Sequence, residues 1–131
     1  MGYGSYPKIK EFDAEGTCVM TVQFGEDSVV SSYRAYRNKW VGKPKAKPAV
    51  SACNADGKTS VYMSWNGATE HQTWKVYSGA TQGNITFAGT TEKSGFETVA
   101  TVSKAGFVQV EASGEGVEAK RSLVSAVKSA C

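Results

Sequence analysis

Apolar and polar residues alternate in short segments along most of the chain, which is the pattern of half-buried β-strands. The clearest segments are TCVMTVQF (17–24), TSVYMSW (59–65) and TWKVYSG (73–79). Turn sequences rich in Gly and Asp separate such segments, as in ADGK at 55–58. Further segments of this kind are IKEF (9–12), VVSSYRAYR (29–37), AVSACN (49–54), NITFAGT (84–90), FETVATV (96–102) and GFVQVEA (106–112). The pattern predicts an all-β protein.

The spacing of these segments predicts an antiparallel β-sandwich of the fibronectin-III/immunoglobulin-like kind, because turn signals recur about every 10–14 residues. The predicted division is a hairpin segment at 1–40, a Pro/Lys linker at 41–48, the sandwich at 49–122 and a C-terminal tail at 123–131. Residues 117–122 are predicted to form the last strand of the sandwich. Leu123, Val124 and Val127 recur at helical spacing, so the end of the chain is expected to be helical or frayed.

The stretch SVYMSWNGATEHQTWKVYSG (60–79) holds two of the three tryptophans and the only histidine. Trp65 and Trp74 fall on inward positions of consecutive strands, where each could bury on the order of 200 Å². An aromatic pair on one strand face is more often core than ligand platform. His71 lies between the two strands and is expected to be a solvated loop residue without a catalytic role.

The charge and cysteine content exclude few classes of protein. The formal net charge is +3, and Lys43, Lys45 and Lys47 alternate with prolines in VGKPKAKP (41–48). This stretch is either an anion-binding patch or a solvated linker, and we favour the linker, with no nucleic-acid partner.

Cys18 and the two other cysteines, Cys53 and Cys131, have no CxxC spacing, so no metal or cofactor is predicted. One disulfide with one free thiol is compatible with this count, and the sequence leaves the pairing open. No apolar run predicts a membrane span or a signal peptide within this chain.

Several stretches together resemble a known family. SVYMSWNGATEHQTWKVYSG (60–79), SGFETVATV (94–102) and FVQVEASGEG (107–116) resemble the C-terminal region of fungal arylsulfotransferase-like secreted proteins. GYGSYPKIKEFDAEGTCVMTVQF (2–24) is similar to the last propeller strands of that family, and SYRAYRNKWVGKPKAKP (32–48) is similar to its connector. The resemblance implies a secreted protein in which a propeller-blade remnant precedes a fibronectin-III-like sandwich.

The resemblance carries over no catalytic residue. The bacterial arylsulfotransferases use a histidine as the transiently sulfated nucleophile, with further histidines and an arginine around it, and none of those positions has a counterpart here. The 131 residues are also too few for a propeller, which normally has at least about four four-stranded blades. We therefore expect a non-catalytic binding or interaction module. The alternatives are a small secreted carbohydrate-binding or effector protein and a fragment of an aryl sulfate sulfotransferase.

The sequence also suggests a ligand-binding site, a glycosylation site and a partner chain. A cluster of aromatic and basic residues is a candidate site for a glycan or an aromatic anion: Tyr33, Arg34, Tyr36, Arg37 and Trp40. The competing interpretation, which we favour, is that these residues cover the hairpin. Asn84-Ile85-Thr86 is an acceptor for N-glycosylation if the protein is secreted. The apolar face of a lone hairpin needs a partner surface. Either the hairpin folds back on the sandwich or two chains form a homodimer through residues 1–40, and we favour the homodimer.

Overall fold

The computed structural model describes all residues from Met1 to Cys131. It is all-β, with no helix and 51% of residues in strands, as the sequence predicts. The chain divides into two compact units, Met1–Lys39 and Trp40–Cys131. It contains no helix that is long and apolar enough to span a membrane.

The first unit holds one antiparallel hairpin, formed by β1 (Lys8–Phe12) and β2 (Cys18–Gln23). The Asp13 carboxylate accepts hydrogen bonds from the backbone N–H groups of Glu15 and Thr17, at 3.1 and 2.7 Å, and so fixes the turn between the strands. The side chains of all six β2 residues are exposed.

The strand predicted at 29–37 does not form, and that prediction was wrong. Two hydrogen bonds donated by Ser32, one from its backbone and one from its hydroxyl, explain the difference. The Ser32 N–H donates to the Gly4 carbonyl at 2.9 Å, and the Ser32 hydroxyl donates to the Arg34 carbonyl at 3.2 Å. These bonds satisfy backbone groups outside a β-ladder, and the second is a local side chain-to-backbone bond of the kind that Ser commonly forms.

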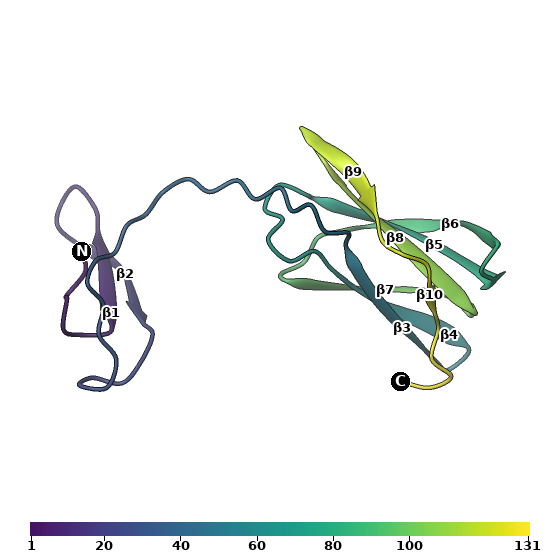
Figure 1. Ribbon diagram of the computed structural model, residues 1–131, viewed down its shortest axis with the longest axis horizontal. Helices are drawn as coiled ribbons and strands as arrows, with labels where there is room; N and C mark the ends of the chain where they lie inside the picture. The colour runs from purple at the N-terminus through teal and green to yellow at the C-terminus, as the bar shows by residue number, and fades with distance from the viewer. The chain divides into compact units, whose positions relative to one another are not determined.

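The second unit is an antiparallel β-sandwich, and the sequence prediction is confirmed. One sheet has the order β3-β4-β7, with bounds Ala49–Ala55, Lys58–Ser64 and Glu97–Ser103. The other has the order β10-β8-β5-β6, and β9 pairs with β8 as well. Its strands are β5 (Thr73–Thr81), β6 (Asn84–Glu92), β8 (Phe107–Gly114), β9 (Val117–Arg121) and β10 (Ser125–Ala126). The two sheets form two layers (Figure 1).

The core lies between these layers and is formed mainly by the inward residues of β3, β4, β5 and β8. Trp74 and Val76 face the core from β5 and pair with Ala112 and Val110 of β8. Only 1% of the Trp74 surface and 7% of the Trp65 surface are exposed. Both tryptophans are therefore core residues, as the alternation in sequence predicts.

The C-terminal tail contains no helix, so the helical expectation for the chain end was wrong. Residues 125–126 form β10 against β8, and Lys128 exchanges backbone hydrogen bonds with β3, donating to Ala52 and accepting from Asn54. A disulfide joins Cys53 of β3 to Cys131, which leaves Cys18 as the free cysteine. Pairing with two strands satisfies the tail backbone at both sheets, and this outweighs the helical spacing of its apolar residues.

Candidate functional site

A hollow of about 380 Å³ lies at the end of the sandwich where β4 leads into β5 and β8 leads into β9. Three segments form its wall: residues 42–45 before β3, residues 65–71 after β4, and residues 116–120 around β9. Its volume falls within the range of small-molecule sites, roughly 300–1,000 Å³. Trp65, Ala68 and Val117 provide apolar surface within it.

The Pro/Lys stretch is held on the sandwich by hydrogen bonds. Gly42 and Thr69 bond in both directions: the Gly42 N–H donates to the Thr69 hydroxyl at 2.9 Å, and the Thr69 N–H donates to the Gly42 carbonyl at 3.3 Å. The Trp65 indole N–H donates to the Ala46 carbonyl at 2.8 Å. A Cβ at position 42 would lie 1.9 Å from the Gly67 carbonyl oxygen, so this close approach requires glycine. The stretch expected to be a linker therefore forms one wall of the hollow.

His71 is buried, so its predicted place as a solvated loop residue was wrong. Only 4% of its surface is exposed, and its ring lies 5.8 Å from the Trp65 ring and 4.9 Å from the Trp74 ring, the latter edge-on. Its Nδ1 is buried without a hydrogen-bond partner. The loop folds over the end of the core, and a residue in such a loop leaves no periodic signal in the sequence.

Burial lowers the pKa of His71, and the nearby Lys93 ammonium lowers it further. The imidazole is therefore neutral at pH 7 and offers one donor and one acceptor. His71 lines the hollow beside Trp65 and also a second, more open one beside Lys93. Buried polar atoms rarely lack a hydrogen-bond partner in folded proteins, so the unpaired Nδ1 of His71 requires an explanation.

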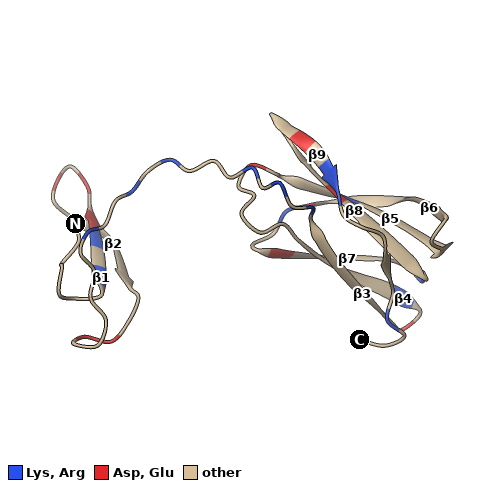
Figure 2. Ribbon diagram, in the orientation of Figure 1, with Lys and Arg blue, Asp and Glu red and all other residues tan.

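The charged groups around the first hollow are mixed in sign, with an excess of cations. Lys43, Lys45 and Lys120 line it together with Glu70 and Glu118. Figure 2 shows the basic segments on the chain leading into β3 and on β9, beside an acidic segment of β9. The Lys120 ammonium donates to the Lys45 carbonyl at 2.6 Å, which ties β9 to the wall.

The structure brings together only part of the aromatic and basic cluster that the sequence indicates. Tyr33 and Tyr36 are 86% and 74% exposed in the first unit. The Arg34 guanidinium lies 5.0 Å from the Tyr33 ring centre and donates to the Tyr36 hydroxyl at 3.1 Å. Arg37 instead pairs with the Glu11 carboxylate. Trp40, 77% exposed, belongs to the sandwich unit.

The glycosylation acceptor lies in an exposed hairpin. Asn84 is the first residue of β6 and pairs with Thr81 of β5 across a tight turn. Residues 80–84 are all exposed. The acceptor side chain is therefore accessible from solvent.

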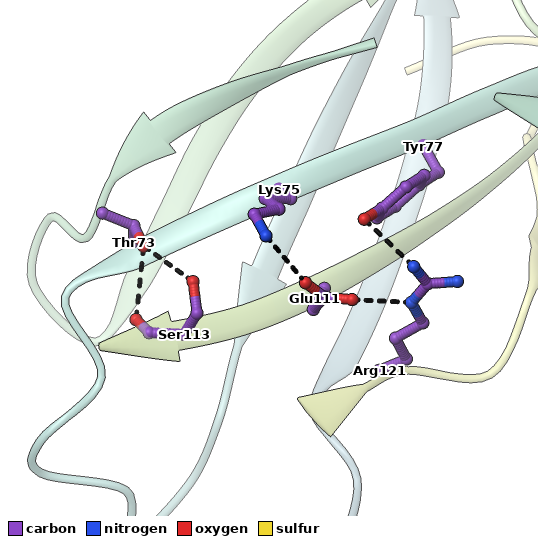
Figure 3. Close-up of polar contacts among 6 residues, drawn as sticks. All are labelled: Thr73, Lys75, Tyr77, Glu111, Ser113 and Arg121. Carbon is purple, nitrogen blue, oxygen red and sulfur yellow. Dashed lines mark hydrogen bonds and ion pairs between the residues drawn. The ribbon is translucent and has the colours of Figure 1, made fainter. Parts of the chain in front are cut away.

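A polar network on the outer face of β5, β8 and β9 was not anticipated from the sequence (Figure 3). Glu111 of β8 accepts hydrogen bonds from Lys75 of β5 at 3.2 Å and from Arg121 of β9 at 2.7 Å. Arg121 also lies 4.4 Å from the Tyr77 ring centre and donates to its hydroxyl at 3.1 Å. In the register of the strands, Lys75 lies opposite Glu111, and Glu111 lies opposite Arg121. Opposite charges on outward positions are a detectable signal once strand pairing is known.

The network pairs its own charges and so serves to hold β9 on the sheet. The hydrogen bond from Arg121 is the main cause that lowers the pKa of Glu111, and Lys75 adds to it against the opposing effect of burial. Because the folded pKa lies below the unfolded one, the carboxylate stabilises the fold above its ordinary pKa. This contribution is lost as the pH falls through the folded pKa.

We expect Glu111→Gln to lower the free energy of unfolding at pH 7 by on the order of 1–2 kcal/mol, because it removes the charge that both cations contact. The difference from wild type is expected to shrink as the pH falls from about 4 through the lowered pKa of the folded Glu111 carboxyl, because the wild type then loses the same charge. Urea unfolding across this pH range measures it. Glu97→Gln, at an exposed position of β7 outside every ion pair, is the matched control and should change little. A gap that stays constant down to pH 2 would contradict this role of the charge.

Comparison with protein-family models, curated proteins and solved structures finds no match to this chain. No group of three or more His, Cys, Asp or Glu side chains is placed to hold a metal ion. The hollow beside Trp65 and His71 is thus the candidate site that the geometry favours most.

Proposed function

We propose that the sandwich unit is a non-catalytic binding module, and that the hollow beside Trp65 takes a small ligand with an aromatic ring and an anionic group. The observation that carries this proposal is the buried Nδ1 of His71, which has no hydrogen-bond partner, in a residue that lines a hollow of about 380 Å³. A small ordered ligand or water at that wall would relieve the unpaired polar group.

The chemistry of the wall supports an aromatic anion in particular. Trp65 and Val117 offer apolar surface for a ring. Three lysines face two carboxylates around the hollow, so the local charge favours an anion. Aryl sulfates combine both properties in one small molecule, and they are the probe used below.

We also propose that the chain is related to the C-terminal region of fungal arylsulfotransferase-like secreted proteins. The support is the set of sequence stretches at 2–24, 32–48, 60–79, 94–102 and 107–116. A secreted origin is further supported by the Cys53–Cys131 disulfide, because disulfides persist mainly in oxidising compartments. The exposed position of Asn84 is compatible with glycosylation there.

A second candidate function is glycan binding by the first unit. The specific observation in its favour is the pair of exposed rings, Tyr33 and Tyr36, with Arg34 held between them. Exposed aromatic rings beside a guanidinium offer both stacking surface and hydrogen-bond donors to a sugar ring.

Isothermal titration of the full chain with 4-nitrophenyl sulfate tests the leading proposal. Saturable binding is expected, tighter than that of the neutral 4-nitrophenyl glucoside. The double variant Lys43→Gln/Lys45→Gln is expected to raise the Kd about three- to tenfold, because exposed charge pairs contribute roughly 0.2–1 kcal/mol each. The matched control is Lys58→Gln/Lys104→Gln, which removes two exposed lysines at the opposite end of the sandwich.

Three results would reject the proposal. The first is no saturable binding of the sulfate. The second is an equal loss of affinity in both double variants, which would indicate a general charge effect. The third is release of 4-nitrophenolate that disappears in His71→Ala, which would make the protein an enzyme. Glucoside binding that is lost in Tyr33→Ala would favour the second candidate instead.

A further inference from the structure

The hairpin of the first unit has one occupied edge and one free edge. On the outer side of β1, the Lys10 N–H donates to the Met1 carbonyl at 3.0 Å, and the Met1 amino group donates to the Lys10 carbonyl at 2.6 Å. Gly2 forms a bridge with Ile9 on the same side. β2 has β1 as its only strand neighbour. The free edge of the unit is therefore the outer edge of β2.

This edge lacks the usual protection against pairing with another strand. Proteins commonly protect exposed edges with charged side chains, with proline or with covering segments. β2 reads CVMTVQ, with no charged residue and no proline, and all six of its residues are exposed. Val19 and Met20 are 57% and 42% exposed. The occupied strand β1, by contrast, carries Lys8, Lys10 and Glu11.

We propose that β2 pairs edge to edge with β2 of a second copy of this chain, antiparallel and around a two-fold axis. Antiparallel self-pairing places a strand opposite itself, and an uncharged strand then brings no like charges together. The product is a four-stranded sheet in place of a two-stranded hairpin, which is marginally stable in water by itself.

The occupied edge of β1 determines the size of the assembly. Because each copy offers only one free edge in this unit, pairing through β2 uses up both free edges and stops at two chains. A second copy is favoured over an open chain of copies for this reason. The proposal does not depend on the ligand-binding function of the sandwich.

Sedimentation velocity on the full chain tests this proposal. It is run in a Cys18→Ser background, so that a disulfide between the exposed Cys18 residues cannot produce a dimer. We expect a species of twice the monomer mass. Val19→Lys and, separately, Thr21→Lys place like charges across the two-fold axis, and each is expected to weaken dimerisation at least tenfold. The matched control is Val99→Lys on β7, which adds the same charge at a 50% exposed strand position of the sandwich.

Amide hydrogen exchange of residues 18–23 gives a second measurement. In the same Cys18→Ser background, protection of these amides is expected to rise with protein concentration without a further substitution and with Val99→Lys, and not with Val19→Lys. A Cys18→Ser monomer, a species larger than a dimer, a dimer that survives both β2 variants, or a dimer lost with Val99→Lys would each overturn the proposal.

Discussion

Removal of the Cys53–Cys131 disulfide is expected to lower the free energy of unfolding of the sandwich by about 4–5 kcal/mol. The bond closes a loop with a sequence separation of 78 residues, and the chain-entropy relation for a loop of that length gives about 4.5 kcal/mol. The stabilisation comes mainly from the unfolded chain, which the crosslink restricts. Cys131→Ser is the preferred variant, because it leaves the buried Cys53 as a small apolar thiol in the core.

Urea unfolding of wild type, of Cys131→Ser and of wild type with reductant measures this effect. The variant and the reduced wild type should agree, with midpoints lowered by roughly 2 M at a typical slope for a small domain. Cys18→Ser is the control and should unfold like wild type, because its thiol is free and exposed. Equal midpoints for Cys131→Ser and wild type would show that the disulfide contributes nothing to stability.

Most strands of the sandwich could be predicted from sequence because each has one face in the core. In β4, residues Val61 and Met63 are buried while Tyr62 and Ser64 are partly exposed, so the period-two pattern is preserved. The same reasoning failed for residues 29–37. Their alternation matches a strand, but Ser32 forms hydrogen bonds to the Gly4 and Arg34 carbonyls in place of a β-ladder.

The tail could not be predicted for a related reason. Leu123 is 69% exposed, whereas Val127 packs against the core, although both fit one helical face in the sequence. What decides their conformation is the pairing with β8 and β3 and the link from Cys131 to Cys53. These contacts join residues far apart in the chain, so no local pattern records them.

The candidate site was even less visible in the sequence. Trp65 was identified correctly as a core residue, but its role in the wall of a hollow depends on the position of residues 42–46. His71 was assigned to solvent because loops usually are exposed. The only local sequence feature that indicates an ordered loop is a glycine. Gly42 permits a close contact with Gly67 that no other residue would allow.

Trp65→Ala is expected to lower the free energy of unfolding by roughly 3–5 kcal/mol, the range for large core truncations. The side chain is 7% exposed and packs in the core cluster with Trp74. It also donates to the Ala46 carbonyl at 2.8 Å, so its loss frees the wall segment as well. Denaturant midpoints of variant and wild type measure the total effect.

Trp65→Phe separates the two contributions of this side chain. Phenylalanine retains most of the apolar contact but cannot donate to the Ala46 carbonyl, so a loss of only about 1 kcal/mol is expected, the value of one hydrogen bond. If the hollow is the ligand site, this variant should also weaken binding of 4-nitrophenyl sulfate, because the wall at 42–46 is no longer tied to the ring. A midpoint for Trp65→Ala equal to that of wild type would make Trp65 a surface residue. Stability lost equally in the Phe and Ala variants would place its main role in the hydrogen bond to Ala46 and not in the core.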